Sequence, residues 1–183
     1  MKILFIGFRG VGKTTLGEEL AKRLGLPFLD ADTEIEKKEG RSIKEIVEKQ
    51  GWAYFRKLEK DFLRGLFSMD NLVCALGGGA VLHEEEMEAL SRESLIIWVK
   101  ASLDKIKERI LKDEKTLTQR PSLTGLGFEE ELEKVYKERE LLYKKWAHFE
   151  VDTTEDNLEL AIFKILNFLK GEEGDGQYHC RCY

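Results

Sequence analysis

The amino-acid sequence predicts an α/β fold of three layers, in which helices cover both faces of a five-stranded parallel sheet. Short apolar runs alternate along the chain with amphipathic stretches of helical period, which is the pattern of parallel strands joined by helical crossovers. The first apolar run leads directly into a glycine-rich loop. With 183 residues and neither an internal repeat nor a linker, the chain has the length of one domain.

The first strand is expected at residues 2–6, an apolar run that the glycine-rich loop ends. A helix follows at 14–24, where apolar residues recur at helical spacing until Gly25, a typical helix stop. Residues 26–30 form the second strand, which ends in an acid. Residues 32–40 look helical, and two further helices precede the third strand, the first of which begins with a Ser42–Glu45 capping box. These two helices are expected at 42–49 and 52–67.

The rest of the chain continues the alternation. The remaining strands are expected at 71–76, 94–99 and 148–152, and the remaining helices at 84–91, 102–112, 129–147 and 157–170. Residues 112–127 lack periodicity, and an aperiodic stretch of this length in a compact domain is usually functional, often a lid. We therefore expect one domain at 1–170, with an insertion at about 31–62, a lid at about 112–127 and a disordered tail at 171–183.

Composition excludes several classes of protein. The net charge of −5 argues against the clustered basic surface of a nucleic-acid-binding protein. No apolar run reaches the roughly 18 residues of a membrane-spanning helix, and the apolar N-terminus is too short for a secretory signal. We expect a cytoplasmic protein that binds neither nucleic acid nor membrane. Cys74 is expected in the core, while Cys180 and Cys182 lie beside His179 in a tail whose composition favours disorder over a metal site.

The glycine-rich loop, GFRGVGKTT at residues 7–15, matches the G-x-x-x-x-G-K-T pattern that holds nucleotide phosphates. Its glycines let successive backbone N–H groups point at phosphate oxygens, and the following helix adds its positive end. Lys13 is expected to reach the β- and γ-phosphates, and the Thr14 hydroxyl to bind Mg²⁺. The expected nucleotide-binding residues are Gly10, Val11, Gly12, Lys13, Thr14 and Thr15.

Two acids follow the second strand. Many nucleotide hydrolases carry a metal-directing aspartate at the end of the third strand, where this sequence has Leu76. Asp30 and Asp32 instead stand at the sheet edge where ligands bind in open α/β sheets. Two carboxylates near a magnesium nucleotide suggest that one steadies metal-bound water and the other contacts a substrate hydroxyl. The alternative is that Asp32 only caps the helix that begins here.

Three consecutive glycines, 77–79, follow the third strand. They cost backbone entropy on folding, so they favour a place where a ligand approaches the main chain closely. Arg120 lies in the aperiodic stretch, where it suits neutralisation of a transferring phosphoryl group. Arg56 and Arg139 lie on charged helices and, taken singly, are expected on a solvated face.

The sequence contains, in this order along the chain, the motifs GFRGVGKTT, PFLDADTEIE, GRSIKEIVEKQGWAYFRKLE, LGGGAVL, QRPSL and RELLY. This ordered set resembles the shikimate kinase family. The resemblance covers the chain to about residue 165 and implies the P-loop kinase fold, with a substrate-binding insertion and a lid. It implies ATP-dependent phosphorylation of the shikimate 3-hydroxyl, with Mg²⁺, to give shikimate 3-phosphate and ADP on the route to chorismate and the aromatic amino acids. ATP and shikimate are thus the expected partners of a monomeric enzyme.

The resemblance also implies individual roles. Asp32 resembles the aspartate that binds the substrate hydroxyls and acts as base, and Asp30 the one that holds Mg²⁺ through water. Arg56 and Arg139 resemble the pair that grips the shikimate carboxylate, which suits planar guanidinium groups. The backbone of Gly77, Gly78 and Gly79 is expected to contact the substrate, and Arg120 resembles the lid arginine, which binds ATP. The expected catalytic residues are Lys13, Asp32 and Arg120.

Some features fit less closely. The lid has RPSL where the family usually has an apolar residue after proline, and Arg109 and Thr153–Thr154 match the adenine contacts only loosely. Dephospho-CoA kinase also pairs a phosphate loop with a similar acid motif, but it gives no reason for Gly77–Gly79 together with Arg56. A nucleotide-binding module that senses shikimate without catalysis is the other alternative, although the expected catalytic residues are all present.

Overall fold

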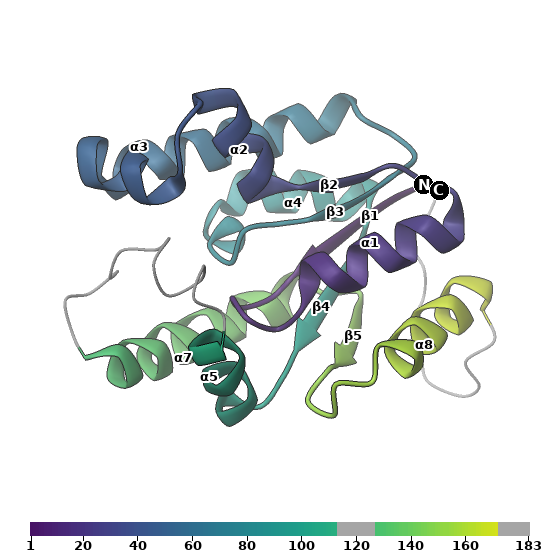
Figure 1. Ribbon diagram of the computed structural model, residues 1–183. Helices are drawn as coiled ribbons and strands as arrows, with labels where there is room; N and C mark the ends of the chain where they lie inside the picture. Colours follow the sequence, from purple (N-terminus) through teal and green to yellow (C-terminus); the bar gives the residue numbers. More distant parts are fainter. Residues whose placement is uncertain (113–126, 172–183) are drawn as a thin grey trace.

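The computed structural model describes residues 1–112 and 127–171. Its centre is one sheet of five parallel strands in the order β2–β3–β1–β4–β5 (Figure 1). The strands are β1 (Lys2–Ile6), β2 (Phe28–Asp30), β3 (Leu72–Ala75), β4 (Leu95–Lys100) and β5 (Phe149–Asp152). The predicted parallel sheet is therefore confirmed. Strand β1 lies in the middle, where Leu4 is paired with Cys74 of β3 on one side and with Ile96 of β4 on the other.

Helices cover both faces of this sheet. They are α1 (Lys13–Leu24), α2 (Ala31–Glu39), α3 (Ile43–Gly65), α4 (Glu84–Glu93), α5 (Leu103–Lys112), α7 (Phe128–Trp146) and α8 (Leu158–Lys170), with short 3-10 turns η1 (Leu66–Ser68) and η2 (Ala80–Leu82). Helices α1 and α8 contact each other on one face, and α4 and α7 contact each other on the opposite face (Figure 1). This arrangement buries the middle strand completely: Ile3 to Ile6 are 0% exposed.

Two boundaries differ from the prediction for identifiable reasons. Strand β2 begins at Phe28 rather than at Leu26, because the Leu26 N–H donates to the Ala21 carbonyl and so closes the end of α1. The two helices expected between residues 42 and 67 adjoin as one element, α3, in which Gly51 is non-helical (φ 82°, ψ 168°). The Ser42–Glu45 capping box is present as predicted.

The region of the predicted insertion has a small hydrophobic cluster of its own. Its buried members are Ile35, Ile43, Ile46, Val47 and Phe55, all from α2 and α3. Both helices lie over the β2 edge of the sheet (Figure 1). This packing holds α3, which carries Arg56, in place relative to the sheet. The lid expected at 112–127 and the tail with His179, Cys180 and Cys182 lie outside the described residues, apart from Lys112, Gly127 and Gly171.

Among the helices in the described ranges, none has the length and apolar character needed to cross a bilayer. Cys74 is buried in β3, as predicted.

A histidine closes the pairing of β4 with β5 and makes stability depend on pH. The ring nitrogen Nδ1 of His148 accepts a hydrogen bond from the Ile96 N–H at 3.0 Å, and the backbone N–H of His148 donates to the Ile96 carbonyl at 2.8 Å. Only an unprotonated Nδ1 can accept, and burial lowers the pKa of His148. In the unfolded chain the imidazole binds a proton near pH 6.5, whereas the folded chain resists protonation until lower pH. The unfolded state therefore binds more protons as pH falls, and stability falls with it.

We expect the free energy of unfolding to fall by about 1 kcal/mol between pH 7 and pH 5 relative to that of His148→Asn. The asparagine keeps an oxygen that can accept from Ile96 but does not titrate. Urea denaturation at both pH values measures the difference. Identical pH slopes for the two proteins would contradict this role of His148.

Candidate active site

The glycine-rich loop leaves the carboxyl end of β1 and enters α1. Gly12 is the N-terminal cap of α1 with φ 91°, a left-handed conformation that favours glycine. Gly7 lies so close to β4 that a Cβ atom there would stand 2.2 Å from the Val99 carbonyl oxygen. The Lys13 ammonium donates to the carbonyls of Gly7 and Phe8, both at 2.9 Å. The lysine is thus folded over the loop, at the positive end of α1.

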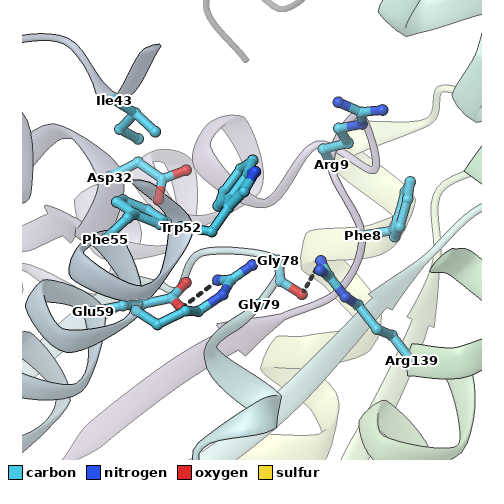
Figure 2. A pocket seen from close by; sticks show the side chains of 11 residues that line it. Phe8, Arg9, Asp32, Ile43, Trp52, Phe55, Glu59, Gly78, Gly79 and Arg139 are labelled. Carbon is cyan, nitrogen blue, oxygen red and sulfur yellow. Dashed lines mark hydrogen bonds and ion pairs between the residues drawn. The ribbon is translucent and has the colours of Figure 1, made fainter. Parts of the chain in front are cut away.

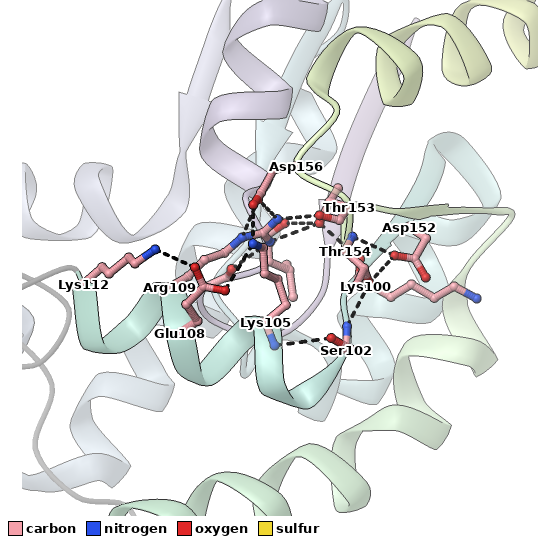
Figure 3. A network of polar contacts seen from close by, with 12 residues as sticks. Lys100, Ser102, Lys105, Glu108, Arg109, Lys112, Asp152, Thr153, Thr154 and Asp156 are labelled. Carbon is pink, nitrogen blue, oxygen red and sulfur yellow. Dashed lines mark hydrogen bonds and ion pairs between the residues drawn. The ribbon is translucent and has the colours of Figure 1, made fainter.

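A polar network holds this loop from behind (Figure 3). The Thr153 hydroxyl donates to the Val11 carbonyl at 2.8 Å, and Arg109 Nη1 donates to the Gly10 carbonyl at 3.2 Å. Asp156 in turn pairs with Arg109 at 2.5 Å and with Lys105. In a trans peptide the C=O and N–H groups point in opposite directions. Because the Gly10 and Val11 carbonyls point toward this network, the Val11 and Gly12 N–H groups point away from it.

The metal-binding pair of the prediction is in contact. Thr14 Oγ1 donates to Asp30 Oδ2 at 2.7 Å, which brings a hydroxyl and a carboxylate together beside the phosphate loop. Oxygen ligands of this kind suit Mg²⁺, which is usually held by one or two protein groups together with phosphates and water.

The helix cap in this region is Asp30, not Asp32. Asp30 Oδ1 accepts from the Thr33 N–H at 3.1 Å and caps α2, so the alternative that explained Asp32 as the cap is wrong. Asp32 lies in the first turn of α2 and lines a pocket instead. The Asp32 carboxylate also approaches the glycine run, because a Cβ on Gly77 would lie 2.9 Å from its Oδ1.

This pocket opens between the insertion helices and the phosphate loop. Figure 2 shows Asp32, Trp52 and Glu59 on one side of it and Phe8, Arg9 and Arg139 on the other. Its lining consists of Phe8, Arg9, Asp32, Ile43, Trp52, Phe55, Arg56, Glu59, Gly78, Gly79 and Arg139. The structure therefore brings together Asp32, Arg56, Gly78, Gly79 and Arg139 of the predicted set, while Gly77 borders the pocket through Asp32 and Glu59.

The Arg56 guanidinium lies close to the glycine run. A Cβ on Gly79 would stand 2.0 Å from Arg56 Nη1, so only glycine leaves room for the guanidinium. On the other side the guanidinium lies 5.4 Å from the ring of Trp52, within the range of a cation–π contact. Glu59 accepts from Arg56 Nη1 at 2.5 Å. The glycines thus admit the protein's own side chains, a reason for them that the sequence did not reveal.

Arg139 approaches the same glycines from α7. Its Nη1 donates to the Gly78 carbonyl at 3.0 Å, and the buried Tyr143 hydroxyl donates to the same oxygen at 2.7 Å. Burial lowers the pKa of Arg139, and the positive charge of Arg56 adds to the effect. Two guanidinium groups that face one pocket have the geometry and charge to bind an anion with two oxygens.

Sequence reasoning missed six lining residues, of which Glu59 matters most. They are Phe8, Arg9, Ile43, Trp52, Phe55 and Glu59. The Glu59 side chain is 2% exposed, which is rare for a carboxylate without partners. Its spacing of three residues from Arg56 on a helix was a signal for the ion pair. Arg120 lies outside the described residues.

Comparisons with known proteins agree with this geometry. A family model described as shikimate kinase matches residues 9–170. The shikimate kinase of Syntrophus aciditrophicus is 38% identical over 90% of this chain and 88% of its own. That of Macrococcus caseolyticus is 35% identical over 96% of this chain and 100% of its own.

Solved structures extend the likeness to three dimensions. The shikimate kinase of Acinetobacter baumannii, solved in complex with shikimate, has a TM-score of 0.85 and 33% identity, with 95% of each chain covered. A deoxyadenosine kinase of M. mycoides with bound dATP has a TM-score of 0.61 at 19% identity over 93% of this chain and 100% of its own, and shares the fold alone. From the motifs, the fold and the matched family model together, this chain belongs to the shikimate kinase family.

Proposed function

We propose that this protein transfers the γ-phosphoryl group of ATP to the 3-hydroxyl of shikimate, giving shikimate 3-phosphate and ADP on the route to chorismate and the aromatic amino acids. The observation that carries the proposal is the convergence of Arg56 and Arg139 on one pocket beside the phosphate loop. Asp32 lines the same pocket. A carboxylate with neighbouring hydroxyls is the kind of acceptor that these groups match.

The protein is proposed to accelerate phosphoryl transfer by positioning the two substrates and by offsetting negative charge, without forming a covalent bond to either substrate. The Val11 and Gly12 amides and Lys13 bind the phosphates of ATP, together with the backbone of Gly10 and Thr15. The two arginines hold the acceptor carboxylate, and Asp32 orients the attacking hydroxyl and accepts its proton. The role of Arg120 as a second source of positive charge stays a prediction.

Mg²⁺ is assigned to Thr14 and Asp30, the latter through water. Their contact at 2.7 Å supports this assignment. When bound, the ion offsets negative charge on the phosphates of ATP. The monomeric state of the enzyme also stays a prediction. A cytoplasmic location, the single domain at 1–170 and the insertion at about 31–62 stay predictions.

Release of ADP in a coupled assay tests the proposed reaction. Shikimate, other hydroxy acids and dephospho-CoA are each offered with ATP and Mg²⁺. Turnover that depends on shikimate supports the proposal. Turnover with dephospho-CoA instead, or tight shikimate binding without turnover, would overturn it in favour of the second kinase or the sensing module.

The magnesium assignment predicts a specific defect in Asp30→Asn. The amide oxygen still caps α2 through Thr33, so the helix is kept, but the negative charge is lost. We expect the Mg²⁺ concentration for half-maximal rate to rise about tenfold. A magnesium titration at saturating ATP and shikimate measures it. The control is Glu34→Gln on the same helix, and an unchanged magnesium requirement in Asp30→Asn contradicts the role of Asp30.

A further inference from the structure

Behind the acceptor pocket, a histidine contacts the carboxylate that holds Arg56. His83 Nε2 lies 3.1 Å from Glu59 Oε2, and the same oxygen accepts from Arg56 Nη1 at 2.5 Å. The side chains of His83 and Glu59 are 11% and 2% exposed. His83 does not belong to the described residues that line the pocket. Within the described part of the chain, Glu59 is therefore the link between His83 and the acceptor pocket.

The direction of the hydrogen bond follows from the charge of Glu59. Burial favours its neutral acid, but the hydrogen bond from His83 and the charge of Arg56 outweigh this and hold the pKa of Glu59 below its ordinary value. An ionised carboxylate only accepts hydrogen bonds. His83 Nε2 must therefore carry a proton and donate it, in the neutral ring as well as in the imidazolium.

His83 lies at the start of a helix, but its ring does not cap that helix. His83 is the N-terminal cap of α4, a position where serine, threonine, aspartate or asparagine would stabilise the helix. Its side chain makes no capping hydrogen bond. The ring points instead to Glu59 on α3, 24 residues earlier in the chain. The chain thus forgoes a cap and has a donor to the buried carboxylate in its place.

We propose that His83 is a positioning residue of the acceptor site, which orients the Glu59 carboxylate so that Arg56 stays alongside Gly79. Gly79 leaves room for the guanidinium at its present position, where a Cβ would lie 2.0 Å from Nη1. Without the donor, the buried Glu59 loses one of two hydrogen bonds and can turn, and Arg56 turns with it. The acceptor then has to order Arg56 as it binds, which weakens its binding and leaves the nucleotide half unchanged.

The inference rests on the proposed function and is tested by kinetics on three variants of the full chain. His83→Ala removes the donor, His83→Gln restores an amide donor at a similar reach, and His148→Asn changes a histidine outside the site. We expect His83→Ala to raise the KM for shikimate about tenfold, with the KM for ATP unchanged and kcat within about twofold. His83→Gln returns the shikimate KM to within about threefold of the wild-type value, and His148→Asn leaves both KM values unchanged.

A loss of stability alone would not raise the KM for shikimate while leaving the KM for ATP unchanged. An unchanged shikimate KM in His83→Ala, or an equal rise of both KM values, overturns the positioning role. Failure of the wild-type protein to release ADP with shikimate would reject the proposed function itself, which is a different result.

A second measurement does not depend on any variant folding. In ¹H–¹⁵N spectra of the wild-type protein, we expect the His83 ring to be protonated at Nε2 and its signals to shift when shikimate is added. The His148 signals should stay in place. A His83 ring unprotonated at Nε2, or signals that do not respond to shikimate, contradict the inference.

Discussion

Replacing Lys13 by alanine lowers kcat for shikimate-dependent ADP release by at least about a thousandfold. The ammonium group stands over the phosphate loop, where the carbonyls of Gly7 and Phe8 hold it at 2.9 Å. Negative charge on the transferring group and the leaving phosphate changes as the transition state forms. Loss of the Lys13 cation therefore destabilises the transition state more than the bound substrates. A thousandfold loss corresponds to about 4 kcal/mol of transition-state stabilisation. Steady-state kinetics with the coupled assay measures it.

The matched control is Lys22→Ala, a lysine in the last turn of the same helix α1. Its side chain is exposed and far along the helix from the loop, so its removal should leave kcat unchanged. Thermal unfolding of both variants checks that each is folded. Near-normal turnover in Lys13→Ala would refute the assignment of residues 7–15 as the phosphate-binding loop.

Replacing Arg139 by alanine raises the KM for shikimate about a hundredfold and leaves the KM for ATP within about twofold. The expected loss is that of a paired, charge-assisted hydrogen bond in a desolvated pocket, about 3 kcal/mol. The fold should tolerate the change, since the Gly78 carbonyl still accepts from the Tyr143 hydroxyl at 2.7 Å. Initial rates with each substrate varied in turn separate the two KM values.

Two further variants sharpen this test. Arg139→Lys keeps the positive charge but loses the planar fork, so its shikimate KM should fall between those of the wild type and the alanine variant. Lys137→Ala removes an exposed cation from the same helix and should change neither KM. Equal increases of both KM values in Arg139→Ala contradict its role in holding the acceptor carboxylate.

Local patterns were enough to predict the frame of the molecule. Strands β1, β3 and β4 are short, mostly apolar runs, and the loop at 7–15 depends on neighbouring residues alone, so local patterns predicted both. Arg56 and Arg139 could not be placed by local reasoning, because each lies on a charged helix. Only the family resemblance put them in one pocket, as the structure does.

Contacts between distant elements were not predictable. Glu59 and His83 meet because α3 and η2 pack against each other, and no spacing in the sequence encodes that distance. The same holds for Thr153, whose bond to the Val11 carbonyl joins residues 142 positions apart. The choice between Asp30 and Asp32 as the helix cap depended on a start differing by one or two residues, which sequence patterns do not resolve.

The central claim is the transfer of phosphate to one hydroxyl of shikimate, and identification of the product tests it most directly. The wild-type protein is incubated with ATP, Mg²⁺ and shikimate, and the product is examined by ³¹P–¹H correlation spectroscopy, with Lys13→Ala as the control. We expect one shikimate 3-phosphate for each ADP, with the phosphorus coupled to the proton on C3, and none with the variant. Release of free phosphate without a phosphorylated shikimate, or phosphate on a different hydroxyl, would contradict it.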